Sequence, residues 1–300
     1  MKKDLPLISV IMPAYNAEET IEKAILSLLN LNYPKERIEL LIVDNNSSDS
    51  TVDIIGKYPV TLLQECEKQS SYAARNLGVK VAKGEIYAFT DADCIVDVNW
   101  VMMGIEALQK ADLVGGKVEF IYSEKKTSSE MYDSLISMDN ELYILSSKGA
   151  TTANLFVKSS IFSKIGLFDD TVVSGGDMEW TIRASNSGYK IEYSNAVIIR
   201  HPSRKFKDLM AKGFRVGTGF INIWRKSGLS SKQILSNIFR LCIPTRPYYI
   251  RKMVKRRGTT DMYNKIAQVW LVAYLSKLSR ITGILFSLVS RRNKNCLGLK

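Results

Sequence analysis

Short apolar runs alternate with amphipathic segments over the first two hundred residues of the chain. The runs are almost continuously hydrophobic, which is typical of strands buried on both faces. They predict strands at 7–12, 38–43, 60–63, 86–89, 113–120, 155–157, 191–193 and 197–200. Between them, apolar residues recur every three or four positions and predict helices at 18–31, 50–58, 70–82, 98–110, 128–145 and 177–187. Alternating strands and helices predict an α/β fold with a mixed, mostly parallel sheet flanked by helices.

From residue 204 onward the pattern changes to helices that mix apolar and aromatic residues with Lys and Arg. Helices are predicted at 206–224, 231–241 and 247–257. The last segment, 263–289, is the most apolar and is long enough to span a bilayer. Lys277 and Arg280 lie near its middle, however, and each would cost ~2.5–3.5 kcal/mol at the centre of a spanning helix. We therefore expect an interfacial or re-entrant amphipathic helix rather than a span, with a core helix of the folded protein as the alternative.

Positive charge is concentrated in the last third of the chain. Residues 1–199 contain 19 Lys and Arg against 28 Asp and Glu, whereas residues 200–300 contain 23 against 2. Such an asymmetry indicates a negatively charged partner, which could be nucleic acid, an anionic membrane or a phosphorylated substrate. The basic segment has no helix-turn-helix or zinc-binding pattern, so we expect an anionic membrane surface and no nucleic acid.

Chain length indicates the number of domains, and cysteine spacing indicates the redox compartment. Three hundred residues indicate roughly two domains, and we place them at 1–203 and 204–300. The second would be a basic amphipathic helical region that contacts the membrane and the acceptor. The four cysteines are widely spaced, so a reducing compartment is expected. The apolar run at 7–12 is too short for a signal peptide and is interpreted as the first strand.

Two carboxylates follow the apolar run at 86–89. Asp91 and Asp93 would lie at the carboxyl end of a buried strand, where open α/β sheets bind their ligands. Neighbouring carboxylates repel each other unless a cation joins them, and oxygen ligands suit Mg²⁺ or Mn²⁺. Taken alone, either Asp could instead cap the helix predicted at 98–110. The pair indicates a metal site only together with the motifs around it.

Several motifs, in their order along the chain, resemble those of family 2 glycosyltransferases, which are inverting enzymes with the GT-A fold. The matching segments are 10–16, 43–49, 74–78, 90–93 and 176–180, together with Arg183. The resemblance covers about residues 6–202 and implies a GT-A catalytic domain over 1–203. It also implies a nucleotide-diphosphate sugar as donor, with a UDP-sugar favoured, and Mn²⁺ or Mg²⁺ on the diphosphate.

The resemblance implies roles for individual residues at the donor end of the site. Contacts to the nucleotide are implied for Pro13, Ala14, Tyr15, Asn16, Asp44, Arg75 and Asp91. A carboxylate such as Asp44 accepts hydrogen bonds from a base or ribose, and Arg75 can bind a phosphate bidentately. Asp93 is implied as the direct metal ligand, with Asp91 beside it. His201, the single histidine, would complete the metal site, with a packed or surface histidine as the alternative.

At the acceptor end, Asp177 is implied as the catalytic base. Inversion requires a carboxylate that takes the proton of the acceptor hydroxyl while its oxygen attacks the anomeric carbon. Glu179 is the competing carboxylate and is expected to bind Arg183 or the loop, and helix capping is the alternative for both acids. The residues assigned to acceptor contact or loop support are Asn154, Gly176, Glu179, Trp180 and Arg183.

These inferences predict a metal-dependent inverting glycosyltransferase on the cytoplasmic side of a membrane, peripheral or monotopic. The Gln-x-x-Arg-Trp signature of processive polymerases is absent, so one sugar would be added per encounter. The acceptor would be a hydroxyl or phosphate of a lipid-linked glycan or polyprenyl phosphate in cell-surface polysaccharide or glycan assembly. The alternatives are a soluble transferase for a protein or small molecule, and a basic membrane- or nucleic-acid-binding module on an inactive GT-A scaffold.

Overall fold

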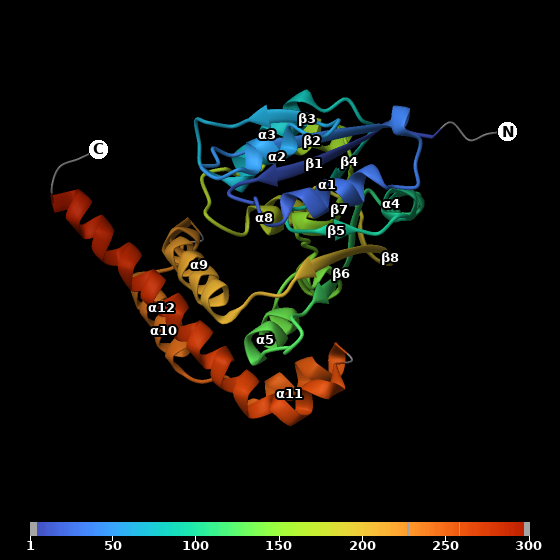
Figure 1. Ribbon diagram of the computed structural model, residues 1–300. Coiled ribbons are helices and arrows are strands. Elements are labelled where there is room, and N and C mark those ends of the chain that lie inside the picture. The colour runs from blue at the N-terminus through green and yellow to red at the C-terminus, as the bar shows by residue number, and fades with distance from the viewer. Residues whose placement is uncertain (1–4, 227, 258, 297–300) are drawn as a thin grey trace. The chain divides into compact units, whose positions relative to one another are not determined.

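The computed structural model describes residues 5–226, 228–257 and 259–296 (Figure 1). The chain divides into two compact units. The first comprises the residues up to 121 together with 138–171 and 175–202. The second comprises 122–137, 172–174 and the residues from 203 onward. The first unit therefore contains the sheet, and a helical insertion at 122–137 belongs with the C-terminal helices.

A single mixed sheet forms the centre of the first unit. Among the described residues its strands follow the order β3-β2-β1-β4-β7-β6-β8-β5. The strands β1 to β4 are parallel, β7 is antiparallel to β4 and β6, β8 is parallel to β6, and β5 is antiparallel to β8. Their bounds are β1 Ile8–Ala14, β2 Ile38–Asp44, β3 Thr61–Gln64, β4 Ile86–Phe89, β5 Ile95–Val96, β6 Leu113–Ile121, β7 Leu155–Lys158 and β8 Ile191–Pro202. The predicted mixed, mostly parallel sheet is confirmed.

The order of the strands creates a place for a ligand. The chain runs from β1 outward to β2 and β3, and then returns to β4 on the other side of β1. The carboxyl ends of β1 and β4 therefore form a topological switch point, where loops diverge and open α/β sheets bind ligands. Ala14 of β1 pairs with Asp44 of β2, so both strands end at this edge.

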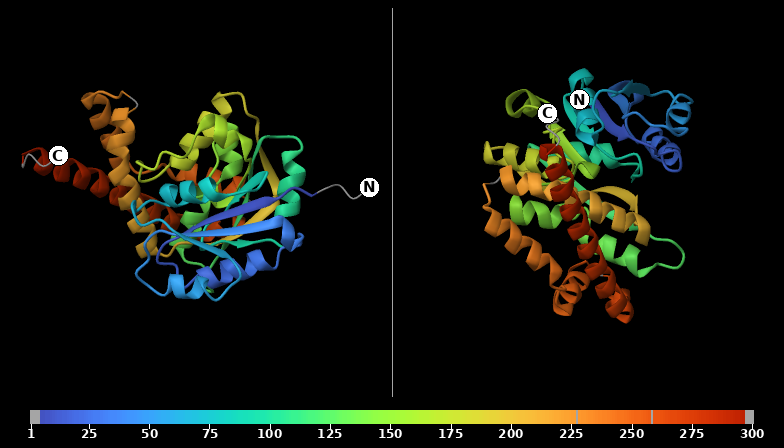
Figure 2. Two further views of the ribbon diagram at one scale, coloured as in Figure 1. Left: turned by 90° about the horizontal axis from the view of Figure 1, so that it is seen from above. Right: turned by 90° about the vertical axis from the view of Figure 1, so that its left-hand side faces the viewer.

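Helices cover both faces of the sheet (Figures 1 and 2). One face packs against α1 Ile21–Leu29, α2 Thr51–Ile55 and α4 Trp100–Leu108 in a single apolar core. The opposite face packs against α3 Ser71–Val81, α7 Ser160–Ile165 and α8 Gly176–Asn186, where Phe162 stacks on Trp180 with ring centroids 4.2 Å apart. Helix α6, Asn140–Ser147, contacts β6 and β8. Short 3₁₀ turns lie at Lys35–Arg37 and Thr152–Asn154.

Two local predictions and one alternative were wrong. The helix predicted over 128–145 is two helices, α5 Ser128–Ile136 and α6, because Met138 has a left-handed φ of 49° and the Asp139 side chain caps α6 by accepting from Leu142 N. The two strands predicted at 191–200 form one strand, β8, whose pairing with β6 shifts register between Gly116 and Lys117. Neither Asp91 nor Asp93 caps a helix, since α4 begins at Trp100 with β5 before it.

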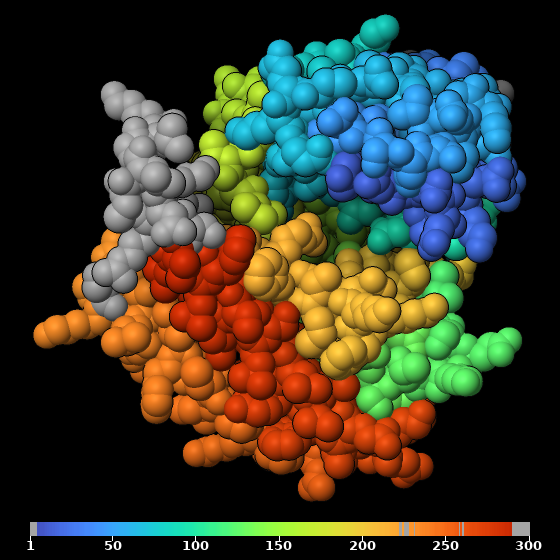
Figure 3. Space-filling model, turned by 60° about the vertical axis from the view of Figure 1, so that its left-hand side comes forward, coloured from blue at the N-terminus to red at the C-terminus, as the bar shows by residue number. Residues whose placement is uncertain are grey.

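The second unit consists of helices. They are α5, α9 Phe206–Lys226, α10 Ser231–Cys242, α11 Pro247–Arg256 and α12 Ile266–Cys296, with a 3₁₀ turn at Thr260–Lys265. α12 packs closely on α9, since a Cβ on Gly217 or Gly283 would overlap the carbonyl oxygen of Arg280 or Phe214. Figure 3 shows α12 in red lying between α9 in gold and α10 in orange. By length and composition, Asp261–Val289 is long and apolar enough to cross a membrane.

Overpacking the sheet core at Gly104 is expected to destabilise the first unit. A Cβ at this position of α4 would lie 2.6 Å from Cδ1 and Cζ of Phe156, which is fully buried against Trp100. We expect Gly104→Ala to lower the free energy of unfolding by about 1–3 kcal/mol, although alanine is the better helix former. Chemical denaturation measures this change. The control is Gly56→Ala, whose Cβ would lie no closer than 3.6 Å to its neighbours, and an equal loss in both variants would contradict the packing argument.

Candidate active site

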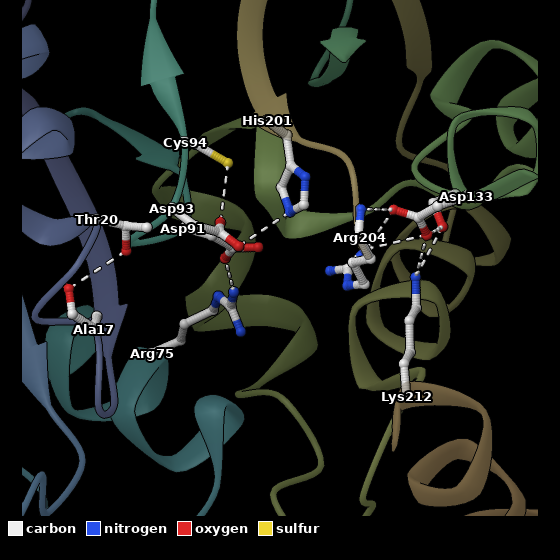
Figure 4. Close-up of polar contacts among 11 residues, drawn as sticks. Ala17, Thr20, Arg75, Asp91, Asp93, Cys94, Asp133, His201, Arg204 and Lys212 are labelled. Atoms are coloured by element: carbon white, nitrogen blue, oxygen red, sulfur yellow. Dashed lines mark hydrogen bonds and ion pairs between the residues drawn. The ribbon is translucent and has the colours of Figure 1, made fainter. Parts of the chain in front are cut away.

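The predicted donor residues meet at the switch point of the sheet. Asp44 ends β2, Tyr15 follows β1, and Asp91 and Asp93 follow β4. All of these strands are parallel, so their carboxyl ends lie along one edge. Figure 4 shows Asp91 and Asp93 with Arg75, Cys94 and His201 gathered around them.

Asp91 is bound by a buried arginine. Arg75 lies on α3, which begins after Ser70, whose hydroxyl accepts from Tyr72 N. Arg75 is 4% exposed and donates from Nη2 to Asp91 Oδ1 and from Nη1 to Ser71 O, the latter over 3.3 Å. Its Nε has no hydrogen-bond partner among the described residues. A buried guanidinium with an unused N–H is suited to bind an anionic ligand, and here it also fixes one oxygen of Asp91.

His201 contacts Asp93 because of a short strand, β5, that the hydrophobic pattern did not predict. β5 begins two residues after Asp93 and pairs with the end of β8, with Ile95 opposite Arg200. This pairing brings His201 to Asp93, with Nε2 to Oδ2 at 3.1 Å. The imidazole is 1% exposed, whereas the Asp93 side chain is 36% exposed. A buried nitrogen beside an accessible carboxylate is a suitable pair of cation ligands.

The donor atoms around Asp93 fit a hard divalent cation. One potential ligand atom each of Asp91, Asp93 and Cys94 lie within 4.8 Å of one another. Burial, with the charges of Asp93 and Asp91, raises the pKa of the Cys94 thiol well above its ordinary value. The thiol therefore stays protonated and donates to Asp93 Oδ1, with Sγ and Oδ1 3.6 Å apart. Carboxylate and imidazole donors remain, and this set suits Mn²⁺ or Mg²⁺.

At the predicted nucleoside end, Asp44 has one oxygen available for a ligand. The residue is 1% exposed, and its Oδ2 accepts from Ser47 N at 3.1 Å. Its buried Oδ1 has no partner among the described residues. Leaving a buried acceptor unpaired costs about 1–3 kcal/mol, so a donor N–H or O–H of a ligand would satisfy it. Tyr15, 53% exposed, lies beside this edge, since it follows Ala14, the partner of Asp44.

Loop contacts keep this end of the site in place. Asn16 has a left-handed φ of 44°, and its Oδ1 accepts from Ser48 N at 2.9 Å. Pro13 and Ala14 are the last residues of β1 and pair with Val43 and Asp44. These contacts join the loops after β1 and β2, between which the predicted nucleoside would bind.

Asp177 lies at the start of α8, directly after Gly175 and Gly176. Its Oδ1 accepts from Met178 N at 3.0 Å and from the Tyr72 hydroxyl at 3.3 Å, and its Oδ2 accepts from Thr152 N at 3.4 Å. Burial raises the pKa of Asp177 above its ordinary value, and the charge of Asp91 adds to this, while Arg75 and the backbone N–H groups oppose it. A carboxylate with a raised pKa is a stronger proton acceptor, as a general base requires.

The other residues near Asp177 support the loop. Arg183 donates from Nε to Glu179 at 2.8 Å and from Nη2 to Leu167 O at 2.9 Å. Trp180 is fully buried and donates to Gly166 O at 2.7 Å. Asn154 is also fully buried and satisfied: its amide nitrogen donates to Lys117 O and Val197 O, and its oxygen accepts from Trp100 Nε1, all at 2.9 Å. Asn154 and Trp180 therefore fix the fold around the site, and neither is open to an acceptor.

Comparison with known proteins decides the family. The model described as "Glycosyl transferase family 2" matches residues 9–166, more than half of the chain. The chain belongs to glycosyl transferase family 2. Glycosyltransferase AglE of Haloferax volcanii is 36% identical over 293 residues, which cover 94% of this chain and 96% of that protein. The predicted family and enzyme class are confirmed.

More distant relatives agree with this assignment. A Methanococcus voltae protein, dolichyl N-acetyl-alpha-D-glucosaminyl phosphate 3-beta-D-2,3-diacetamido-2,3-dideoxy-beta-D-glucuronosyltransferase, is 26% identical, with 72% of this chain and 76% of that protein covered. Among solved structures, the mannosyltransferase PcManGT of Pyrobaculum calidifontis, in complex with GDP-Man and Mn²⁺, gives a TM-score of 0.64 at 17% identity, with 94% and 87% of the chains covered. This likeness confirms the GT-A-like fold of the glycosyltransferase.

Sequence reasoning missed two contacts of the candidate base. Thr152 N binds Asp177 from a 3₁₀ turn, and no motif marked that turn. Tyr72 lies three residues before Arg75 on α3, and residues at this spacing share one helix face. The helical spacing was thus an available signal for Tyr72. Burial and the charge of Asp177 raise the pKa of Tyr72 to about 12, so its hydroxyl remains a donor to Asp177 at neutral pH.

Removing the Tyr72 hydroxyl is expected to shift the pH profile of the glycosyltransferase. The hydroxyl donates to the charged form of Asp177, so Tyr72→Phe disfavours that form and raises its pKa further. The acid limb of kcat/KM should move to higher pH, with the larger loss of activity at acid pH. The control is Tyr87→Phe, whose hydroxyl contacts Ala82 O. Superimposable profiles for wild type and Tyr72→Phe would show that this hydrogen bond does not tune the base.

Proposed function

We propose that this glycosyltransferase moves one sugar, with inversion, from a nucleotide-diphosphate sugar to a hydroxyl or phosphate of a lipid-linked glycan or polyprenyl phosphate. The observation that carries the proposal is the position of Asp177. Its carboxylate, with a raised pKa, accepts from Tyr72 on α3. The same helix carries Arg75, which binds Asp91 in the loop after β4. A single base beside a donor site is what an inverting transfer needs.

The residues of the chain account for each part of the transfer. Asp44 would accept from the base or ribose, and Arg75 would meet the diphosphate while holding Asp91. Asp93 and His201, with Asp91 nearby, would bind Mn²⁺ or Mg²⁺, which when bound neutralises charge on the diphosphate leaving group. Asp177 takes the proton of the acceptor hydroxyl as that oxygen bonds to the anomeric carbon. The bond from this carbon to the diphosphate breaks on the opposite face, so an α-linked donor yields a β product.

The donor is expected to be a UDP-sugar, as the family resemblance implies, with a GDP-sugar as the alternative. The GDP-Man complex of the solved structural neighbour supports including that alternative. The open oxygen of Asp44 can accept an N–H from uracil or from guanine, so this residue alone is compatible with both. A screen of donors is therefore needed.

A lipid-linked acceptor is supported by a relative and by the surface of the second unit. The Methanococcus voltae relative is named for a dolichyl-phosphate-linked sugar. On α10 and α11, and at Ile243 directly after α10, large apolar side chains are exposed close in sequence to basic residues. The apolar set is Leu235, Phe239, Ile243, Tyr248 and Tyr249, and the basic set is Arg240, Arg251 and Lys252. Aromatic and basic residues together are typical of helices that lie in a membrane interface. We assign residues 204–300 this role, on the cytoplasmic side of the membrane.

The experiment that tests this function follows a radiolabelled sugar into the organic phase. Purified enzyme would be supplied with labelled donor, Mn²⁺ and a lipid extract containing polyprenyl phosphates and their glycans. We expect labelled lipid, and flotation of the enzyme with anionic vesicles. Label appearing only on protein or small soluble acceptors would overturn the lipid-linked acceptor. Binding to nucleic acid without any transfer would favour the inactive-scaffold alternative.

A further inference from the structure

A buried carboxylate in the second unit is surrounded by more positive charge than it can balance. Asp133 on α5 is fully buried. Arg204 donates to its Oδ2 from the backbone N at 3.0 Å and from Nη1 at 3.3 Å. Lys212 on α9 lies 3.7 Å from Oδ1 and donates to Ser137 Oγ at 2.8 Å. Figure 4 shows Arg204 and Lys212 pointing toward Asp133. Arg204 alone balances Asp133, so the charge of Lys212 is in excess.

Two further arginines add to this excess. Arg215 lies one helical turn after Lys212, and Arg280 is on α12 where that helix packs across Gly217. Neither guanidinium has an ion pair among the described residues, and the buried Nε of Arg280 has no hydrogen-bond partner there. Burial, followed by the charges of Arg204, Arg215 and Arg280, lowers the pKa of Lys212 to about 8 despite Asp133. We call Arg204, Lys212, Arg215 and Arg280 the cationic cluster.

Arg215 is exposed, but the other members of the cationic cluster differ from an ordinary basic surface. The lysines and arginines of α10 and α11, such as Lys232 and Arg251, are exposed, and water can solvate them fully. Lys212 and Arg280 are only partly exposed, and Lys212 is fixed by Asp133 and Ser137. Holding like charges together away from water is unfavourable unless an anion joins them. Residues 200–300 contain only two acids, so the chain offers little compensation of its own there.

We propose that the cationic cluster binds the phosphate or diphosphate group of the lipid-linked acceptor. Guanidinium and ammonium groups together are the usual partners of phosphate oxygens, and the negative charge of a phosphate or diphosphate would offset part of the excess positive charge. The inference rests on the proposed function, which supplies the acceptor class. Arg204 follows His201 by only three residues in the chain, so a short stretch joins the cluster to the predicted metal ligand. Arg215 and Arg280 would bind the acceptor, while Asp133 positions Arg204 and Lys212.

The test compares Arg280→Met and Arg215→Met with the exposed controls Lys232→Met and Lys255→Met in the full-length protein. Inorganic pyrophosphate is the probe, titrated calorimetrically with EDTA so that no divalent metal captures it. We expect binding to be about tenfold or more weaker in each cluster variant, since each loses one charge-assisted contact, and within twofold of wild type in the controls. Arg215 is exposed, so its variant should fold normally even if Arg280→Met does not.

Kinetics then separate the acceptor from other phosphates. The cluster variants should raise the KM for lipid-linked acceptor about tenfold, with donor KM unchanged and vesicle flotation normal. Binding of pyrophosphate that is equal in cluster and control variants would overturn the inference. So would loss of flotation on anionic vesicles with an unchanged acceptor KM, which would identify membrane headgroups as the ligand. If wild type transfers nothing to any lipid-linked acceptor, the proposed function itself fails, and the acceptor assignment fails with it.

Discussion

Replacing Asp93 with alanine is expected to lower metal-dependent transfer by about 1,000-fold or more. Asp93 is the accessible carboxylate of the acidic pair, and it is bound to His201 at 3.1 Å. A cation at a diphosphate leaving group is worth several kcal/mol, and ~1.4 kcal/mol corresponds to a tenfold change in rate. The measurement is kcat/KM over a range of Mn²⁺ concentrations. Calorimetry with the nucleotide present should show that Asp93→Ala also loses affinity for Mn²⁺, and this measurement does not depend on turnover.

A carboxylate on the other side of β5 provides the control for Asp93. Asp97 lies four residues further on and accepts from Asn99 N at 3.0 Å, with no part in the donor cluster. Asp97→Ala should keep most of the activity and the Mn²⁺ affinity of wild type. His201→Gln should weaken Mn²⁺ binding by about 10–100-fold, as expected for a residue that shares or orients a metal ligand. Undiminished Mn²⁺ affinity in Asp93→Ala would place the metal elsewhere.

Replacing Asp177 with asparagine is expected to lower kcat by about 10²–10⁴-fold, the usual contribution of a general base. Asparagine has nearly the same shape and can still accept from Met178 N, so the loop should persist. It cannot take a proton, so the chemical step fails while donor binding continues. Steady-state kinetics should show a reduced kcat with little change in donor KM, and nucleotide binding should match wild type.

Glu179 is the control for Asp177, because it lies in the same first turn of α8 but is paired with Arg183. We expect Glu179→Gln to retain kcat within a few-fold of wild type. A large loss in Glu179→Gln together with an active Asp177→Asn would transfer the role of base to Glu179.

The hydrophobic pattern and the acidic pair were sufficient to predict the sheet and the edge at which the predicted donor residues meet. Continuous apolar runs mark buried strands, and polar residues directly after them must lie at the carboxyl edge. The contact between His201 and Asp93 could not be predicted from pattern, because it depends on β5, two residues long, pairing with β8. A strand of that length carries no periodicity.

Contacts between distant parts of the chain account for the remaining misses. Asn154 is a polar residue in a small-residue turn, and only the structure shows that Trp100, Lys117 and Val197 use all of its hydrogen-bonding groups except one lone pair. Likewise, the charge count located positive charge after residue 200, but Asp133, 71 residues before Arg204, organises part of it. Local sequence indicates which elements form, whereas burial and pairing are set by tertiary packing.

The most direct test of the central claim is a donor screen that follows release of nucleotide diphosphate. Wild type, Asp93→Ala and Asp177→Asn would be supplied with a panel of UDP- and GDP-sugars, Mn²⁺ or Mg²⁺, and lipid extract. We predict that wild type consumes one donor in a metal-dependent reaction and that both variants lose this activity, while Asp177→Asn still binds the donor. Turnover without metal, or turnover that persists in both variants, would contradict the assignment of this edge of the sheet as the active site.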